Sequence, residues 1–289
     1  MMTGHNSGSD SAYRILMGLL EARTGQTLSP SRIWRIELSL KPVLQQHHLA
    51  DMDALVGALV SGADKTLLDD VIDAMLNNET FFFREHQLFD DIARVALYQL
   101  RETNARSRQI TIWHCGVSTG QEAYSIAMQF AEAAELWAGW TIDIIGTDVS
   151  RRAVARARAG IYSQFEIQRG LPAQRMVRWF DQVDAGWLAK AELRRRVDFS
   201  VQNLLVDRPP LSRPADLIFC RNVMLYFAPA TRQKAFARLR TVAAREAFLV
   251  LGAGETVLGQ TDQFVASRRL RGLYEPADLH AARPLARSA

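Results

Sequence analysis

The stretch Ile112-Trp-His-Cys-Gly-Val-Ser-Thr-Gly-Gln-Glu-Ala-Tyr-Ser-Ile-Ala-Met128 decides the fold of this chain. Residues Gln109 to Cys115 are largely apolar and β-branched, and they predict a short buried strand. The next apolar residues recur at helical spacing and predict a helix from Gln121 to Trp137. A strand, a glycine-containing turn and a helix N-terminus together form a concavity lined by backbone N–H groups. Such a concavity suits a nucleotide-like ligand.

The turn by itself leaves two interpretations open. Its glycines, Gly116 and Gly120, are spaced Gly-x-x-x-Gly and lack the full dinucleotide-binding fingerprint. Thr119 and Glu122 also have the spacing of a capping box, which is a purely structural role. The turn therefore either binds a ligand or only begins a capped helix.

Composition restricts the class of protein. The chain has 289 residues, 48% of them hydrophobic and 23% charged, as in a globular protein with a sizeable core. It contains no apolar run of membrane-spanning length and no signal-peptide pattern, so we expect a cytoplasmic protein without membrane insertion. Cys115 and Cys220 end predicted buried strands, and the six histidines have no metal-ligand spacing with them. We predict no metal site.

The charge of the chain is positive, with a net value of +4 and a pI near 9.3. Arginine carries most of it, in patches such as 151–158 and 194–196. An acidic partner suits such a surface, and both nucleic acid and an acidic protein fit. A solvated helix face explains most of these arginines without any partner.

Residues 11–77 predict a small helical domain, because apolar residues recur in successive runs at helical spacing without strand patterns. Its middle helix carries Arg32, Arg35 and Lys41, which we expect to form a basic face. The residues after it, 78–108, are expected to be a linker that contributes to the active site.

This linker begins with an unusual run, Asn77-Asn-Glu-Thr-Phe-Phe-Phe-Arg-Glu-His86. Polar residues that favour a cap precede three consecutive phenylalanines, which we expect to plug the seam between the two domains. A plug does not explain Arg84. A cation beside desolvated aromatics is well placed to meet a carboxylate.

Residues 109–280 alternate strands with helices, which predicts an α/β fold with a parallel, doubly wound sheet. The predicted strand from Thr141 ends at Asp148, and a carboxylate in that position binds ribose hydroxyls in nucleotide-binding folds. Alternatively, Asp148 or Ser150 only caps the next helix. Within the insert near 165–199, residues 185–196 favour helix, so we expect no edge strand to which a peptide could add.

These pieces, in this order, resemble the chemotaxis receptor methyltransferases (CheR), which use S-adenosylmethionine to methyl-esterify glutamates of chemoreceptors. The matching sequence motifs are Asn78-Glu-Thr-Phe-Phe-Phe-Arg84, Ser118-Thr-Gly-Gln-Glu-Ala-Tyr-Ser125, Thr147-Asp148, Ala159-Gly-Ile-Tyr162, Asn203-Leu204 and Phe219-Cys-Arg-Asn-Val-Met-Leu-Tyr-Phe227. The resemblance implies a Rossmann-like methyltransferase sheet with a small all-helical N-terminal domain. It also implies S-adenosylmethionine as cofactor, S-adenosylhomocysteine as product, and the cytoplasmic domain of methyl-accepting chemoreceptors as partner.

The resemblance further implies site residues. Catalytic roles fall to Arg84 and to Tyr226, which it places near the transferred methyl group. The cofactor-binding residues that it implies are Asn78, Thr80, Arg84, Gly116, Glu122, Asp148, Asn203, Leu204, Arg221 and Asn222. The chain departs from the family pattern near its end, where Gly252-Ala-Gly-Glu255 replaces a His-Ser-Glu word. We assign no role to that loop.

Two other functions stay open. The chain could be an RNA or small-molecule methyltransferase on the same fold, because fold alone does not decide substrate. It could also be a non-catalytic module that binds S-adenosylmethionine or docks on receptors. Arg84 and Tyr226 favour a protein-glutamate O-methyltransferase, and no nucleic-acid-binding module is evident. We therefore expect a monomeric enzyme without a nucleic-acid partner.

Overall fold

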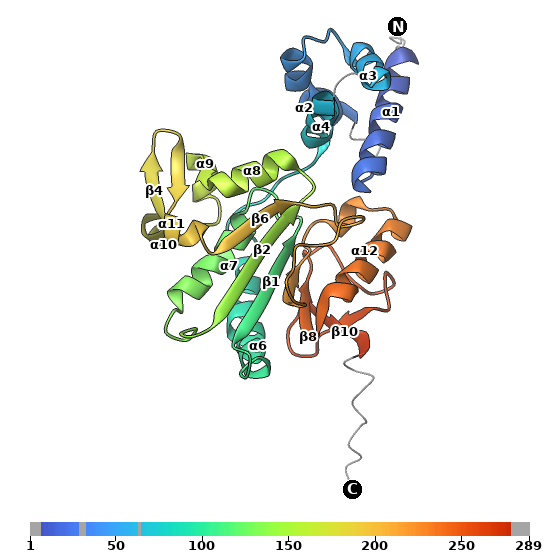
Figure 1. Cartoon of the computed structure of the whole chain (residues 1–289). Coiled ribbons are helices and arrows are strands. Elements are labelled where there is room, and N and C mark those ends of the chain that lie inside the picture. The colour runs from blue at the N-terminus through green and yellow to red at the C-terminus, as the bar shows by residue number, and fades with distance from the viewer. Residues whose placement is uncertain (1–6, 29–32, 63–64, 279–289) are drawn as a thin grey trace. The chain divides into compact units, whose positions relative to one another are not determined.

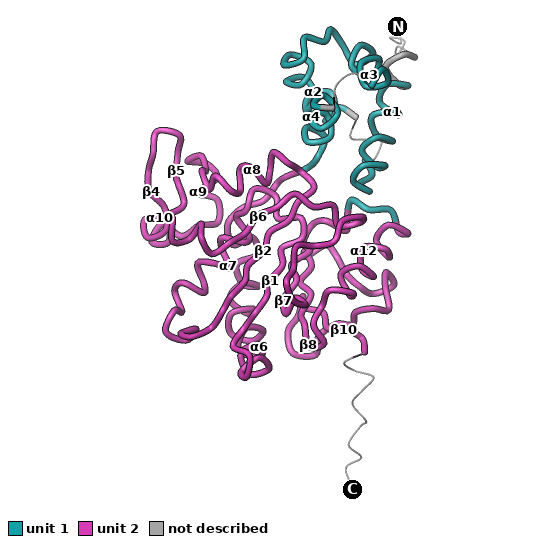
Figure 2. Tube along the Cα trace, in the orientation of Figure 1, with its two compact units in different colours: residues 1–77, 226–228 teal, residues 78–225, 229–289 magenta. Residues whose placement is uncertain are grey.

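The computed structural model describes residues 7–28, 33–62 and 65–278, and the chain divides into two compact units. Unit 1 comprises residues 1–77 and 226–228, and unit 2 comprises residues 78–225 and 229–289 (Figure 2). The short segment from Tyr226 to Ala228 thus belongs to the N-terminal unit, although it follows a strand of the other unit. Nothing in the sequence pattern predicts this assignment.

Unit 1 is helical in its described part. Its helices are α1 (Ser7–Thr24), α2 (Ile33–Gln46), α3 (Met52–Ser61) and α4 (Lys65–Met75) (Figure 1). Their apolar faces form one core that includes Leu16, Leu20, Leu40 and Val71. Helical spacing places these side chains on one face of each helix, and burial of that face stabilises the bundle.

The residues of the predicted basic face of α2 lie in different environments. Arg35 is half-buried, and its guanidinium donates a hydrogen bond to the Asn77 side chain. Lys41 is exposed, and Arg32 lies outside the described residues. Arg35 and Lys41 therefore differ in exposure, and the basic face as a whole stays a prediction.

Unit 2 is organised around a seven-stranded sheet with the order β6-β2-β1-β7-β8-β10-β9. The strands are β1 (Gln109–Cys115), β2 (Thr141–Asp148), β6 (Val197–Val201), β7 (Ala215–Phe219), β8 (Ala243–Val250), β9 (Phe264–Ala266) and β10 (Leu273–Pro276). From β6 to β8 all neighbours are parallel, whereas β10 pairs antiparallel with both β8 and β9. The predicted Rossmann-like, doubly wound sheet is confirmed.

The helices that connect these strands are α7 (Gln121–Glu132), α8 (Arg151–Ala159) and α12 (Pro229–Val242). The chain runs outward from β1 to β2 and β6, then returns to the other side of β1 as β7. The strand order therefore reverses between β1 and β7, and ligands of such sheets bind beyond the carboxyl ends of the strands at this point. Helix α7 is shorter than predicted, because the chain turns after Glu132 and packs Trp137 on Phe130 at 4.9 Å.

Residues 78–108 are part of unit 2 rather than a linker. They form α5 (His86–Asp91), the π-helical turn η2 (Ile92–Ala96) and α6 (Leu97–Thr103). The Phe82 ring lies 5.0 Å from Tyr162, and the Phe83 ring lies 5.4 Å from Phe89. These two phenylalanines fill the core of unit 2.

The insert forms a small sheet of its own, with the order β3-β5-β4. Its elements are β3 (Ile161–Tyr162), α9 (Gln164–Gln168), α10 (Ala173–Trp179), β4 (Phe180–Val183), β5 (Gly186–Ala189) and α11 (Ala191–Arg194). The prediction of helix across residues 185–196 is wrong for β5, because pairing on both sides overrides the helical propensity of Leu188 and Ala189. β4 is an edge strand, so the expected absence of such a strand is also wrong.

Candidate functional site at the carboxyl edge of the sheet

The turn after β1 has an unusual backbone. Gly116, Ser118 and Gly120 all have positive φ, at 79°, 53° and 93°. A Cβ atom on Gly116 would come within 2.4 Å of the Val223 side chain, so this position needs glycine. The backbone N–H groups of this turn are used within unit 2: those of Gly116 and Val117 donate to the carbonyl of Thr147 at 2.8 and 2.9 Å, and that of Gly120 donates to the carbonyl of Val117 at 3.1 Å.

The capping-box interpretation of this turn is wrong. Gly120 is the N-cap of α7 and provides no side-chain hydrogen bond. The Thr119 hydroxyl donates to the Gln121 side chain at 2.7 Å, and Glu122 binds elsewhere. The first turn of α7 therefore begins without a capping side chain.

Asp148 joins this turn to the loop after β2. Its carboxylate is buried and accepts the backbone N–H of Ser118 at 2.8 Å and that of Ser150 at 2.9 Å. The helix-capping alternative falls to Ser150, whose hydroxyl accepts the N–H of Ala153 at the start of α8. Asp148 is thus held in a fixed orientation at the end of its strand.

The segment that begins at Asn78 lies against the same two loops. The Asn78 carbonyl accepts the Ser118 hydroxyl at 2.7 Å, and its side-chain amide lies 3.5 Å from the Ser150 hydroxyl. Thr80, two residues further on, is half-buried. The structure therefore brings Asn78, Ser118 and Asp148 together, although they are distant in sequence.

An ion network around a buried arginine lies at the end of β7. The Arg221 side chain, only 1% exposed, pairs with Glu122 at 2.8 Å and with Glu85 at 2.9 Å. It also donates to the carbonyl of Arg84 at 3.1 Å. Glu122 in turn accepts a hydrogen bond from the His114 ring at 3.0 Å. Four separate segments of unit 2 are therefore tied together by one guanidinium and its partners.

The charges in this network stabilise one another. Burial alone would raise the pKa of Glu122, but the hydrogen bond from His114 and the positive charge of Arg221 outweigh it and lower the pKa below its usual 4.5. Burial would lower the pKa of Arg221, but the carboxylates of Glu122 and Glu85 raise it. Both groups are therefore ionised at neutral pH. Their mutual pairing makes them a rigid support for the loops around them.

Arg84 lies in a strained part of the backbone. Its neighbours Phe83 and Glu85 both have positive φ, at 49° and 65°. Such conformations cost of order 1–3 kcal/mol each and persist where surrounding contacts impose them. Here Arg221 imposes them, through the Glu85 carboxylate and the Arg84 carbonyl.

The Arg84 guanidinium itself is lightly held. It lies 5.6 Å from the centre of the Phe81 ring. Among the described residues its one hydrogen bond is a long one of 3.4 Å to the carbonyl of Glu79. A fixed backbone with a lightly bound cation is the arrangement expected of an arginine that receives an anionic group.

Glu255 is a site residue that the sequence reasoning missed. Its carboxylate accepts the N–H groups of Asn222, Gly252 and Leu225 at 2.7, 2.8 and 3.2 Å. Asn222 is held there with a φ of 59°. The loop at Gly252, to which we assigned no role, therefore fixes the loop after β7. The sequence signal that could have indicated this role is that Glu255 keeps the final glutamate of the His-Ser-Glu motif.

The other predicted site residues have hydrogen-bond partners outside the two clusters around Ser118 and Arg221. Asn203 closes its own loop after β6, accepting the N–H of Leu205 at 2.9 Å, and Leu204 is buried. Tyr226 belongs to unit 1, where its hydroxyl accepts a hydrogen bond from Asn77. Among residues 7–28, 33–62 and 65–278 no cluster of metal-ligating side chains occurs. The described helices are too short or too polar to cross a membrane.

Comparison with known proteins identifies the family. Residues 78–271 match the family model described as CheR methyltransferase, SAM binding domain. The chain belongs to the CheR methyltransferase family. The chemotaxis protein methyltransferase of Vibrio parahaemolyticus is 34% identical over 259 residues, which cover 89% of this chain and 93% of that protein. Chemotaxis protein methyltransferase 1 of Pseudomonas aeruginosa is 30% identical over 264 residues, with coverage of 89% and 94%.

S-adenosylmethionine (SAM) is the cofactor of this CheR domain, and the carboxyl edge of the sheet fits it. A carboxylate oriented by two backbone N–H groups, that of Asp148, provides the acceptors that ribose hydroxyls need at the end of a second strand. The left-handed turn at Gly116 and Ser118 brings the Ser118 N–H to this carboxylate and so joins the ends of β1 and β2. The role of each individual residue toward the cofactor stays a prediction.

Proposed function

We propose that this CheR family protein is a protein-glutamate O-methyltransferase that methyl-esterifies glutamate side chains in the cytoplasmic domain of methyl-accepting chemoreceptors. It acts as a monomer in the cytoplasm. The observation that carries the proposal is Arg84, whose strained backbone is fixed by Arg221 while its guanidinium stays lightly bound. The names of the relatives, chemotaxis protein methyltransferases, support the receptor as substrate.

The cofactor is held at the carboxyl edge of the sheet. When bound, SAM supplies a methyl group activated by the positive charge on its sulfur, and S-adenosylhomocysteine is left. Asp148 accepts hydrogen bonds from the ribose hydroxyls. The main chain at Gly116 faces the ligand closely. The remaining residues that we propose to surround the cofactor are Asn78, Thr80, Arg84, Glu122, Asn203, Leu204, Arg221 and Asn222.

Catalysis by this chain rests on positioning. A substrate glutamate is already ionised at neutral pH and is already a nucleophile, so no general base is needed. Arg84 binds its carboxylate by a charge-assisted hydrogen bond. The Tyr226 hydroxyl orients the same carboxylate. Holding reactants in a near-attack geometry supplies much of the rate gain in such a reaction.

The test is transfer of a labelled methyl group. Purified protein is incubated with methyl-labelled SAM and a cytoplasmic receptor fragment, and the product is treated with mild base. The proposal predicts label on the fragment that base releases as methanol, because carboxyl esters are base-labile. A second fragment in which glutamine replaces the candidate glutamates should accept no label. Base-stable label, or label incorporated into RNA in a parallel reaction, would contradict the proposal.

A further inference from the structure

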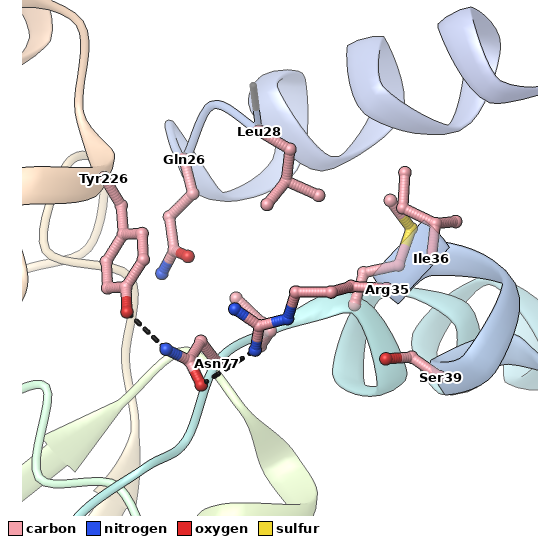
Figure 3. Close-up of a pocket in the computed structure, with 9 residues that line it drawn as sticks. Gln26, Leu28, Arg35, Ile36, Ser39, Asn77 and Tyr226 are labelled. Atoms are coloured by element: carbon pink, nitrogen blue, oxygen red, sulfur yellow. Dashed lines mark hydrogen bonds between the residues drawn. The ribbon is translucent and has the colours of Figure 1, made fainter. Parts of the chain in front are cut away.

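A small pocket in unit 1 contains Tyr226 (Figure 3). Its volume is about 20 Å³, enough for roughly one water molecule, so it does not take a substrate side chain. The side chains of Arg35 and Asn77 line it beside the tyrosine, with Ser39 on its helical side. Arg35, which we expected on a basic face of α2, thus lines this pocket beside Tyr226.

Arg35, Asn77 and Tyr226 form a hydrogen-bonded chain, drawn with dashed lines in Figure 3. The Arg35 guanidinium donates to the Asn77 Oδ1 atom at 3.3 Å, and the Asn77 Nδ2 atom donates to the Tyr226 hydroxyl at 2.5 Å. A guanidinium can only donate, so it fixes which end of the asparagine amide faces it. The amide nitrogen must then face the tyrosine. The Tyr226 oxygen is therefore an acceptor, and its own hydrogen points away from Asn77.

The main chain at Tyr226 is anchored independently of this hydrogen-bonded chain. Its backbone carbonyl accepts the N–H of Thr27 at 2.8 Å and the Thr27 hydroxyl at 3.1 Å. The next residue, Phe227, forms a β-bridge with Gln26. Thr27 and Gln26 thus hold the main chain of this segment, and Asn77 contacts the Tyr226 hydroxyl itself.

We propose that Arg35 and Asn77 are positioning residues that direct the Tyr226 hydroxyl hydrogen toward the substrate carboxylate. This inference rests on the proposed function, in which Tyr226 orients that carboxylate. A tyrosine that donates to Asn77 would present a lone pair to the substrate and repel it. A tyrosine that accepts from Asn77 presents its hydrogen. The Arg35 guanidinium, which can only donate, favours the second arrangement.

The decisive variant is Asn77→Asp. The introduced carboxylate has nearly the same shape but can only accept, and Arg35 keeps it ionised. The Asp carboxylate therefore accepts a hydrogen bond from the Tyr226 hydroxyl. We expect kcat for receptor methylation to fall roughly tenfold or more, the effect of losing one hydrogen bond to a charged group. Asn77→Ala leaves the hydroxyl free to turn, and we expect a loss of only about threefold.

The order of the two variants separates positioning from packing. If Asn77 only fills space, the isosteric Asp variant is the milder one, and that order would overturn the inference. Arg35→Leu should lower kcat and Arg35→Lys should restore part of it, since lysine also donates. Ser39→Ala, in the same pocket but outside the chain of hydrogen bonds, is the matched control and should keep the wild-type kcat.

A spectroscopic readout makes the inference independent of turnover. The Raman doublet of tyrosine reports whether a phenol donates or accepts, and the protein has six tyrosines. Subtraction of the Tyr226→Phe spectrum from the wild-type spectrum isolates the doublet of Tyr226. We expect an acceptor in the wild type and a donor in Asn77→Asp. A donor in the wild type overturns the inference even if methylation is observed, whereas absence of methylation with the expected spectra refutes only the proposed function.

Discussion

The two ends of the central sheet in unit 2 use buried carboxylates in opposite ways. At the carboxyl end, Glu122 is paired with Arg221 and its pKa is lowered. At the amino end, Asp216 accepts the N–H of Thr111 at 2.8 Å and the amide of Asn104 at 3.1 Å, with a more distant arginine. Burial there outweighs these contacts and raises the pKa of Asp216. Ion pairing thus lowers the carboxyl pKa at one end, and burial raises it at the other.

The backbone shows the same contrast. Among the described residues, the non-glycine positions with positive φ are His48, Phe83, Glu85, Arg108, Ser118 and Asn222. Four of them lie in or beside the loops at the carboxyl end, where Asp148, Arg221 and Glu255 hold them. Strained residues persist where surrounding contacts impose them, and they gather at functional sites. Of the other two, Arg108 precedes β1 at the amino end and His48 lies in unit 1.

The largest effect is expected from Arg84→Ala. Loss of a charge-assisted contact that acts in the transition state costs about 2–4 kcal/mol, so turnover should fall about a hundredfold or more. Affinity for SAM should change by less than about tenfold, since Asp148 and the turn remain. Steady-state kinetics and calorimetry measure the two quantities.

A matched control exists for this variant. Arg169 lies 4.3 Å from the centre of the same Phe81 ring but is paired with Glu79 at 2.7 Å. Arg169→Ala should leave turnover within about threefold, because exposed ion pairs contribute little. Equal turnover of the two variants would remove Arg84 from the reaction.

The next largest effect is expected from Asp148→Ala. SAM and S-adenosylhomocysteine share the ribose, so both should bind about 10–100-fold more weakly after loss of a charged hydrogen-bond partner. Ser150→Ala serves as control, because it removes the cap of α8, costs about 1 kcal/mol of stability and spares the ribose contact. Unchanged affinity for either ligand would leave Asp148 with a purely structural role.

A smaller effect, on stability, is expected from Glu122→Gln. The variant should lower the free energy of unfolding by about 2 kcal/mol at neutral pH, because Arg221 loses one charged partner. The folded-state pKa of Glu122 lies below its usual 4.5, so its contribution is present above that pH and is lost as the pH falls through the folded value. Urea unfolding at several pH values should show the difference from wild type shrinking in acid.

The smallest effect is expected from Asp216→Asn, with the opposite sign of pH dependence. The folded-state pKa lies above the usual 3.8, so the contribution of Asp216 is present below that pH and is lost as the pH rises through the folded value. The variant should therefore gain stability relative to wild type between acid and neutral pH. Methylation activity should not change. A variant that loses activity would erase the contrast between the two ends of the sheet.

Sequence periodicity was enough for the central sheet but not for contacts between distant segments. The strands at Gln109, Thr141 and Ala215 carry local apolar patterns that long-range packing reinforces. The strand at Gly186 has no such pattern and exists because Phe180 and Tyr162 lie on strands that flank it. By contrast, the turn at Ser118 was predicted from the local glycine spacing.

Contacts between segments that are distant in sequence were not visible in this way. Glu255 meets Asn222 across 33 residues, and Arg35 meets Asn77 across 42. No local spacing encodes such pairs, so pattern reasoning left Glu255 without a role and placed Arg35 on an outer surface. Family resemblance indicated which residues gather at the site, and the structure adds how they are held.

The most direct measurement is the position of the methyl group after a single turnover. Wild-type protein and Arg84→Ala are each mixed with SAM and a receptor fragment, quenched, and the fragment is sequenced by tandem mass spectrometry. The account predicts the mass of one added methyl group on a glutamate side chain with the wild type, and almost none with the variant in the same time. A methyl group on any other residue type, or equal methylation of glutamate by both proteins, would contradict it.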